Sequence, residues 1–287
     1  MELFWQVIIN GAELSATYAL VAVGLTLLFG IMRVFNFAHG EFFMVGAYVV
    51  WLVYSVAGWP FLAAAVLSVF VVGVLGIAVE RSLFRPLREN PLAVFIGSIG
   101  LSFIFQVAVG QAWGVGWPKP VNSPFQMVLN IFGGRIGLQT FIVIPLSFAL
   151  LGGLWIFMHR IKMGQALRAC AQDAETASLQ GISIDRMKMI AMALGCALAG
   201  VAGAFMAPLI SVDPYMGTRV IMKSFMVVIV GGVGIIEGTI LAALLFGFLD
   251  SAVTTVADST IANVVGLLIM LIILAVRPRG ILGRAQI

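Results

Sequence analysis

Few side chains in this sequence could do chemistry, and those that could are scattered singly along or beside long apolar runs. Ionisable groups at membrane depth are costly, so each one is a candidate for function. The sequence contains no phosphate-binding G-x-x-x-x-G-K-[ST] motif, catalytic triad or paired carboxylates. We therefore expect a conduit rather than a catalyst. The polar residues in question are Glu13, Asn36, His39, Glu41, Glu80, Glu237, Asp250 and Asn263.

Two glycine-containing segments, FGIMRVFNFAHGEF (29–42) and VGGVGIIEG (230–238), interrupt the apolar runs. Each places a glutamate at the start of the next run, where a helix dipole would favour an anion. Interrupted segments in corresponding places indicate a transport pathway, although two ordinary turns would give the same pattern. For the histidine we favour a structural role over a ligand role. The predicted pathway residues are Asn36, Phe37, His39, Gly40, Glu41, Gly231, Gly232 and Glu237.

The composition places these segments in a membrane protein. The chain has 287 residues, of which 62% are hydrophobic and 10% are charged, whereas soluble domains carry about 25% charged residues. We predict a single all-α domain (1–287), a polytopic membrane bundle of about eight or nine spans with broken or re-entrant helices. The candidate spans are 6–30, 38–58, 61–80, 92–112, 139–158, 187–209, 221–234, 238–256 and 261–276.

Some parts of this bundle stay open. The spans at 221–234 and 238–256 could form a re-entrant hairpin or a pair of short helices. Within the long loop 112–137, PFQMVLNIF could be a short strand, a short helix or irregular surface. The small residues of ALGCALAGVAGAF (193–205) predict a helix face that packs closely against a neighbour. Cys170 and Cys196 are not expected to pair, and no metal-ligand spacing is present.

Lysine and arginine in the loops predict the orientation. Alternate loops carry twelve such residues on one side and four on the other, which places the N-terminus outside and the C-terminus inside. The charges do not form the basic stripe typical of nucleic-acid binding. The twelve are Arg33, Arg81, Arg85, Arg88, Arg160, Lys162, Arg168, Arg186, Lys188, Arg277, Arg279 and Arg284; the four are Lys119, Arg135, Arg219 and Lys223.

The polar stretch MGQALRACAQDAETASLQGI (163–182) differs from everything around it. Residues 165–180 contain no proline or glycine, so we predict one helix that ends at Gly181 in the C′ position. Ser183 or Asp185 would cap the next helix. One face carries mostly small residues, and the pattern fits either a solvated linker or a helix that docks on a partner. That small-residue face consists of Leu167, Ala171, Ala174, Ala177 and Gly181.

Residues 175–181, ETASLQG, resemble the E-A-A-x-x-x-G signature of ABC-importer permeases, with Thr176 in place of the first alanine. The segments 24–48, 163–182 and 276–284 resemble the permease subunits of branched-chain amino acid ABC importers, with Gln165 where arginine is usual. The resemblance implies the ABC-importer permease fold and a coupling helix (163–182) that contacts an ATPase. The implied contact residues are Arg168, Gln172, Asp173, Glu175, Ala177 and Gly181.

The same resemblance implies a complex in a bacterial inner membrane. A second permease subunit, two ABC ATPases and a periplasmic binding protein would join this chain, with a periplasmic N-terminus and a cytoplasmic C-terminus. This chain would hold no cofactor, because ATP-Mg would bind to the ATPases. Branched-chain amino acids are the favoured cargo, while other amino acids, urea, amides and aromatic acids stay open. A gradient-driven secondary transporter is the alternative from another class.

Overall fold

A computed structural model describes residues 2–131 and 134–283, most of them in helices. Only one pair of strands, β1 and β2, interrupts the helical order in this part of the chain. The elements are α1 (Glu2–Met32), α2 (His39–Val50), η1 (Trp51–Val56), α3 (Phe61–Val79), η2 (Glu80–Phe84), α4 (Arg85–Leu87), α5 (Pro91–Trp113), β1 (Val128–Ile131), β2 (Gly134–Gly137), α6 (Leu138–Arg160), α7 (Lys162–Gln172), α8 (Ala174–Leu179), α9 (Ile184–Met206), α10 (Met216–Gly231), α11 (Ile236–Val256) and α12 (Ser259–Val276).

The helices are long enough and apolar enough to form the predicted membrane bundle. Eight candidate spans occur among the described residues, and each predicted span except 221–234 has a counterpart among them. The exception falls on α10, which has 16 residues and is separated from α11 by the turn 232–235. The open question over 221–256 therefore resolves into a short α10 followed by a full-length α11.

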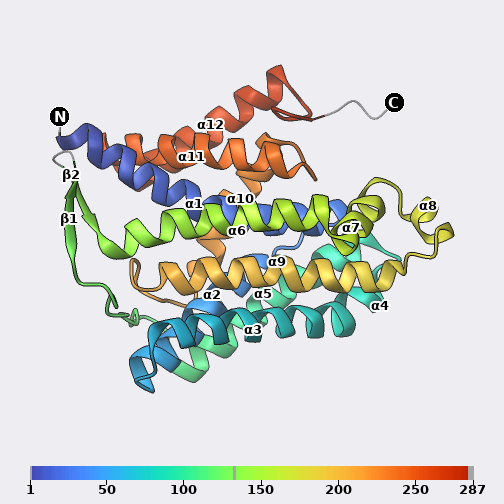
Figure 1. Cartoon of the computed structure of the whole chain (residues 1–287), viewed down its shortest axis with the longest axis horizontal. Coiled ribbons are helices and arrows are strands. Elements are labelled where there is room, and N and C mark those ends of the chain that lie inside the picture. Colours follow the sequence, from blue (N-terminus) through green and yellow to red (C-terminus); the bar gives the residue numbers. More distant parts are fainter. Residues whose placement is uncertain (1, 132–133, 284–287) are drawn as a thin grey trace.

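The long helices run along the longest axis of the molecule (Figure 1). α1 lies inside the bundle, where it packs against α9, α10 and α11, and α9 packs in turn against α2 and α3. Figure 1 places β1, β2 and the start of α1 at one end, and α7 and α8 at the other. α1 thus starts at the β1–β2 end of the molecule, whereas α12 finishes toward the α7–α8 end (Figure 1).

Backbone contacts between glycines hold the centre of the bundle together. A Cβ on Gly195 of α9 would lie 2.9 Å from the Gly24 carbonyl oxygen of α1, and a Cβ on Gly24 would lie 2.7 Å from the Gly195 oxygen. Gly203 of α9 likewise contacts the Phe43 backbone of α2. Such contacts are possible only where at least one of the two residues has no side chain. The predicted small-residue packing face of 193–205 is confirmed.

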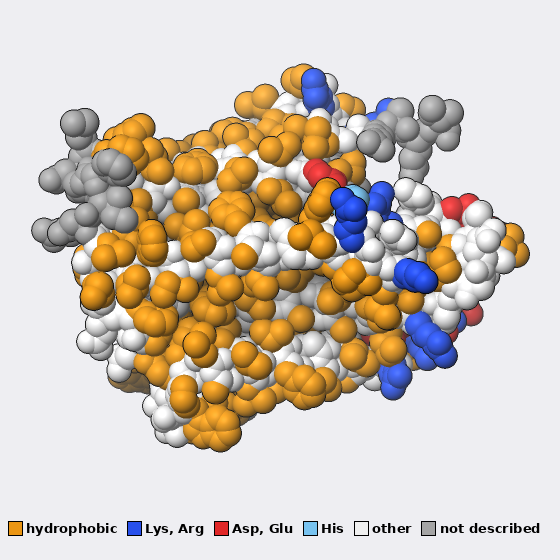
Figure 2. Space-filling view, in the orientation of Figure 1, with side chains coloured by type: hydrophobic (Ala, Val, Ile, Leu, Met, Phe, Trp, Pro, Cys, Tyr) orange, Lys and Arg blue, Asp and Glu red, His pale blue; other side chains and the backbone are white. Residues whose placement is uncertain are grey.

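Apolar side chains cover the outside of the bundle, and basic side chains gather at one end. Exposed Phe70, Phe103, Leu271 and Ile272 are examples from α3, α5 and α12, as expected for surfaces that face lipid. Figure 2 shows Lys and Arg side chains at the α7–α8 end of this view. Of the predicted set on that side, Arg284 lies outside the described residues.

The loop before α6 forms a short antiparallel hairpin, so the strand reading of PFQMVLNIF is the correct one for Val128–Ile131. β1 pairs with β2 from Val128 opposite Gly137 to Ile131 opposite Gly134. Earlier in the loop, Lys119 forms a backbone bridge with Val212. The bridge joins this loop to the segment between α9 and α10.

Candidate functional site

The polar stretch forms two helices, α7 and α8, rather than the single helix predicted over 165–180. The break is at Asp173, whose backbone is extended (φ −149°, ψ 104°). Its Oδ1 accepts hydrogen bonds from the backbone N–H groups of Glu175 (3.0 Å) and Thr176 (3.1 Å). Aspartate satisfies the free N–H groups of a helix start better than it continues a helix. The side chain therefore ends α7 by capping α8.

The end of α8 agrees with the prediction. Gly181 has φ +81°, the left-handed conformation that glycine adopts at C′. The Gly181 N–H donates to the Ser178 carbonyl (2.9 Å) and the Ile182 N–H to the Ala177 carbonyl (3.2 Å). These two bonds form a Schellman motif, which satisfies carbonyls at the helix end. α8 is thus a short helix closed at both ends.

Most of the predicted coupling residues lie on the surface of α7–α8. Arg168, Gln172, Asp173, Glu175 and Gly181 are exposed. Ala177 is only 4% exposed, so it packs inside this chain and is not available to a partner. Ala177 and Leu167 of the predicted small-residue face are buried, whereas Gly181 of that face is exposed.

Leu179 is a surface residue that sequence reasoning missed. It is 81% exposed in the last turn of α8. A large apolar side chain so exposed on a polar loop suggests an interaction surface. The one available signal was its position off the small-residue face of the helix.

Hydrogen bonds at Asp173 favour its charged form. The Thr176 hydroxyl donates to Asp173 Oδ2 at 2.5 Å, and this bond, followed by the backbone N–H bonds, holds the pKa of Asp173 below its usual value. A carboxylate that accepts several hydrogen bonds keeps its charge more readily. The α8 cap is therefore a negatively charged group on the surface of the loop.

An ion-pair cluster fixes the chain just after α8. Asp185, in the first turn of α9, pairs with both Arg85 and Arg88. The N-cap position of α9 is Ser183, whose side chain makes no capping hydrogen bond. Neither Ser183 nor Asp185 thus caps α9 as predicted, because the arginines bind the Asp185 carboxylate instead.

The NFAHGE segment (36–41) lies inside the bundle. A break at Arg33 (φ 54°) turns the chain back, and α2 then begins at His39. The side chain of Glu41 is fully buried, and its Oε1 accepts hydrogen bonds from Ser102 (2.7 Å) and Gln106 (2.8 Å) of α5. Gln106 also donates to Thr218 of α10 (2.8 Å). Glu41 therefore connects α2 to α5 and, through Gln106, to α10.

The other residues of this segment also make interior contacts. His39 is fully buried, with Nε2 3.2 Å from the Val21 carbonyl oxygen of α1. The backbone N–H of Phe37 donates to Ser98 (3.1 Å). Asn36 is buried, and its side-chain amide makes no hydrogen bond to a described residue. Gly40 contacts the backbone of Gly217 on α10. The segment thus meets α1, α5 and α10.

The second group of predicted pathway residues lies around 231–237. Its glycines pack against neighbouring backbone, whereas its glutamate lines a cavity. Gly231 contacts the backbone of Gly238, and Gly232 has φ +107°, beside Gly283. Glu237 is exposed in the first turn of α11, unlike buried Glu41. Both glutamates lie in first helix turns, as predicted, but in different surroundings.

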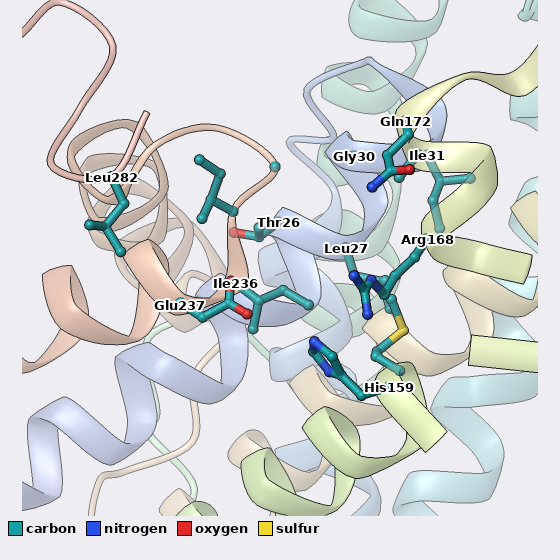
Figure 3. A pocket seen from close by; sticks show the side chains of 14 residues that line it. Thr26, Leu27, Gly30, Ile31, His159, Arg168, Gln172, Ile236, Glu237 and Leu282 are labelled. Carbon is teal, nitrogen blue, oxygen red and sulfur yellow. The ribbon is translucent and has the colours of Figure 1, made fainter. Parts of the chain in front are cut away.

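A cavity of about 640 Å³ brings residues of the two predicted sets together (Figure 3). It lies among α1, α6, α7 and the α10–α11 turn. Arg168 and Gln172 of α7, from the predicted coupling set, line it together with Glu237, from the predicted pathway set. The full lining is Thr26, Leu27, Gly30, Ile31, Met158, His159, Arg168, Ala171, Gln172, Gly234, Ile235, Ile236, Glu237 and Leu282.

A buried ion pair corrects one sequence assignment. Lys223, assigned to an outer loop, is buried within α10, and its Nζ lies 2.8 Å from the Asp250 carboxylate of α11. The Tyr18 hydroxyl of α1 donates to Asp250 Oδ2 (2.8 Å). Lys223 was counted with the outer-loop charges although it falls within the predicted span 221–234, and α10 begins earlier than that span, at Met216. Asp250 thus joins three packed helices, α1, α10 and α11.

Comparison with known proteins decides the family. The family model described as branched-chain amino acid transport system / permease component matches residues 7–276. The chain belongs to this permease family. The permease is 33% identical to the high-affinity branched-chain amino acid transport system permease protein LivH of Escherichia coli K12, over 99% of this chain and 97% of the relative. It is 31% identical to the corresponding protein BraD of Pseudomonas aeruginosa, over the same shares of the two chains.

A solved structure has a related fold. PsaBC from Streptococcus pneumoniae, in complex with Fab, matches 95% of the permease and 92% of its own chain. The TM-score is 0.54 at 13% sequence identity, so this likeness concerns the fold alone. Together with the family match, it identifies the bundle as a multi-span transport subunit with the permease fold.

Proposed function

We propose that this chain forms the translocation path of an ATP-driven importer for branched-chain amino acids. The near-full-length similarity to LivH and BraD, whose names specify that cargo, supports the proposal most directly. In this proposal a periplasmic binding protein delivers the amino acid, a second permease subunit completes the path, and two ATPases bind ATP-Mg. The basic α7–α8 end faces the cytoplasm, which places the start of α1 on the periplasmic side.

The α7–α8 segment is the proposed contact with an ATPase. Exposed Glu175, Leu179 and Gln180 form a small surface on α8, with one apolar side chain among polar ones. Interfaces often rely on a few apolar residues inside a polar rim. The caps at Asp173 and Gly181 give α8 a defined shape before it meets a partner, which lowers the cost of ordering it on binding.

The movement of α8 would reach the membrane spans through its covalent neighbours. The Arg85 and Arg88 pairs with Asp185 attach the start of α9 to α4 and to the residue that follows it. α9 in turn contacts α1 through Gly195 and α2 through Gly203. We propose that ATP-driven closure of the ATPase pair moves α8, and that α9 transmits this movement to the centre of the bundle.

The test compares Leu179→Asp with Met127→Asp in the reconstituted complex. Met127 is also exposed, but it directly precedes β1, which lies at the opposite end of the molecule (Figure 1). Leu179→Asp should lower ATP-dependent leucine uptake and ATPase stimulation by the loaded binding protein by about tenfold or more. Met127→Asp should leave ATPase binding intact. Normal coupling in Leu179→Asp would contradict the α8 contact, and uptake without ATPases would favour a secondary transporter.

A further inference from the structure

The cavity beside α7 combines two opposite charges with an apolar wall. Arg168 and Glu237 both line it, and neither forms an ion pair or side-chain hydrogen bond with a described residue. Figure 3 shows the Arg168 side chain reaching from α7 and the Glu237 side chain from α11 into the same space. A site with an uncommitted cation and an uncommitted anion suits a ligand that carries both charges.

The apolar part of the lining restricts that ligand further. Leu27 and Ile31 of α1, Ile236 of α11 and Leu282 provide branched aliphatic surface next to the charged groups. Binding sites for small molecules typically combine an apolar wall with a few polar groups that orient the ligand, in cavities of about 300–1,000 Å³. This cavity, at about 640 Å³, falls in that range and would also accommodate water.

We propose that this cavity binds a free α-amino acid with an aliphatic side chain. Arg168 binds the α-carboxylate, Glu237 binds the α-ammonium group, and the aliphatic lining contacts the side chain. The His159 ring also borders the cavity, and its Nδ1 is 2.9 Å from the Trp155 carbonyl oxygen, which leaves Nε2 for the ligand or water. The identity of the ligand rests on the proposed function.

A ligand bound in the cavity would connect the α7–α8 segment to the membrane spans. Arg168 belongs to α7, which ends directly before the Asp173 break, whereas Glu237 lies in the first turn of α11. A ligand bound to both would hold the two helices at a fixed separation. Because the cavity lies at the α7–α8 end, it would fill from the compartment that receives the cargo. Accumulated amino acid would thereby slow the permease by restraining α7.

The experiment measures equilibrium binding of radiolabelled L-leucine to the complete importer complex in lipid nanodiscs, without the binding protein. Arg168→Gln and Glu237→Gln each remove one charge from an exposed side chain, so the fold should persist. Arg160→Gln is the matched control, since Arg160 is exposed near the same end but does not line the cavity. We expect each cavity variant to weaken leucine binding by about tenfold or more and the control to change it less than about twofold.

Ligands that lack one charged group test which side chain binds the carboxylate of leucine and which binds its ammonium group. 4-Methylpentanoate lacks the ammonium group, so its affinity should fall in Arg168→Gln and stay unchanged in Glu237→Gln. 3-Methylbutylamine lacks the carboxylate and should show the reverse. Leucine binding that is absent in the wild-type complex, or equal in both cavity variants and the wild type, would overturn the inference.

Uptake distinguishes this inference from the proposed function. ATP-dependent leucine uptake by the same complex with its binding protein tests the function independently of the cavity. Normal uptake without saturable leucine binding overturns only the cavity site. Absence of uptake for leucine, isoleucine and valine overturns the proposed function and with it the identity of the ligand.

Discussion

Lys223 and Asp250 form an ion pair inside the bundle, with the Lys223 Nζ 2.8 Å from the Asp250 carboxylate. The pair links the short helix α10 to the full-length α11, and the Tyr18 hydroxyl attaches it to α1. Burying two charges is costly, and removing one partner leaves the other unpaired. The pair therefore sets how α10 lies against its neighbours.

Loss of one partner from this pair should destabilise the protein more than loss of both. We expect Asp250→Leu to lower the free energy of unfolding by about 3–5 kcal/mol, because the Lys223 ammonium would stay buried without its carboxylate. The double variant Lys223→Met with Asp250→Leu should recover most of that loss. Denaturant unfolding in detergent checks both values. Equal losses in the single and double variants would contradict this account.

The backbone contact at Gly203 should tolerate no side chain. Gly203→Ala puts a methyl group against the Phe43 carbonyl of α2, and overpacking of this kind costs about 1–3 kcal/mol. Gly100→Ala is the control, since a Cβ there meets nothing within 4 Å. In thermal unfolding, Gly203→Ala should therefore have a lower midpoint temperature than Gly100→Ala. A Gly203→Ala protein as stable as Gly100→Ala would disprove close packing between α9 and α2.

The α8 cap should weaken in acid. The pKa of Asp173 is lowered mainly by its hydrogen bond with Thr176, so its stabilising effect is present above the unfolded-state pKa. That effect is lost as the pH falls through the lower folded-state pKa. The hydrogen-exchange protection factors of residues 174–180, corrected for the intrinsic pH dependence of exchange, should therefore fall at low pH. Asp173→Asn keeps a capping oxygen without a charge and should abolish this pH dependence; a persistent one would implicate another group.

Glu41 should stabilise the interior through its acceptor oxygen Oε1. Glu41→Leu leaves Ser102 and Gln106 without their partner, at a cost of about 1–3 kcal/mol in the free energy of unfolding. Glu41→Gln retains an acceptor oxygen and should cost less. Uptake per folded molecule tests the predicted pathway role separately. Normal uptake in both variants would leave Glu41 as a packing residue.

Hydrophobic runs carried most of the fold information in this sequence. They predicted the helices because a membrane span needs a long apolar segment, whatever its tertiary contacts. The count of loop charges misplaced Lys223, because a lysine inside a span is acceptable only beside a partner such as Asp250, and that pairing depends on three-dimensional packing. Local glycine patterns predicted the α9 face and Gly181, because glycine has a direct backbone consequence.

The candidate site was less predictable than the fold. Helix propensity favoured a continuous 165–180 helix, and a single capping interaction at Asp173 outweighed it. The cavity could not be foreseen, because it joins Arg168 to Glu237 across a long sequence separation. Pattern reasoning identifies which residues are unusual, whereas their meeting depends on how α7 and α11 pack.

The glycine contacts restrict how the bundle can change shape. Gly24 against Gly195, Gly40 against Gly217 and Gly203 against Phe43 bring backbones together without intervening side chains that could rearrange. The backbones of α1, α2, α9 and α10 are consequently packed so closely at their centres that these helices cannot slide along one another without first moving apart. During transport we therefore expect these four helices to move together as one rigid body. The hinges should lie at the periphery of the bundle, in turns such as the one at Asp173.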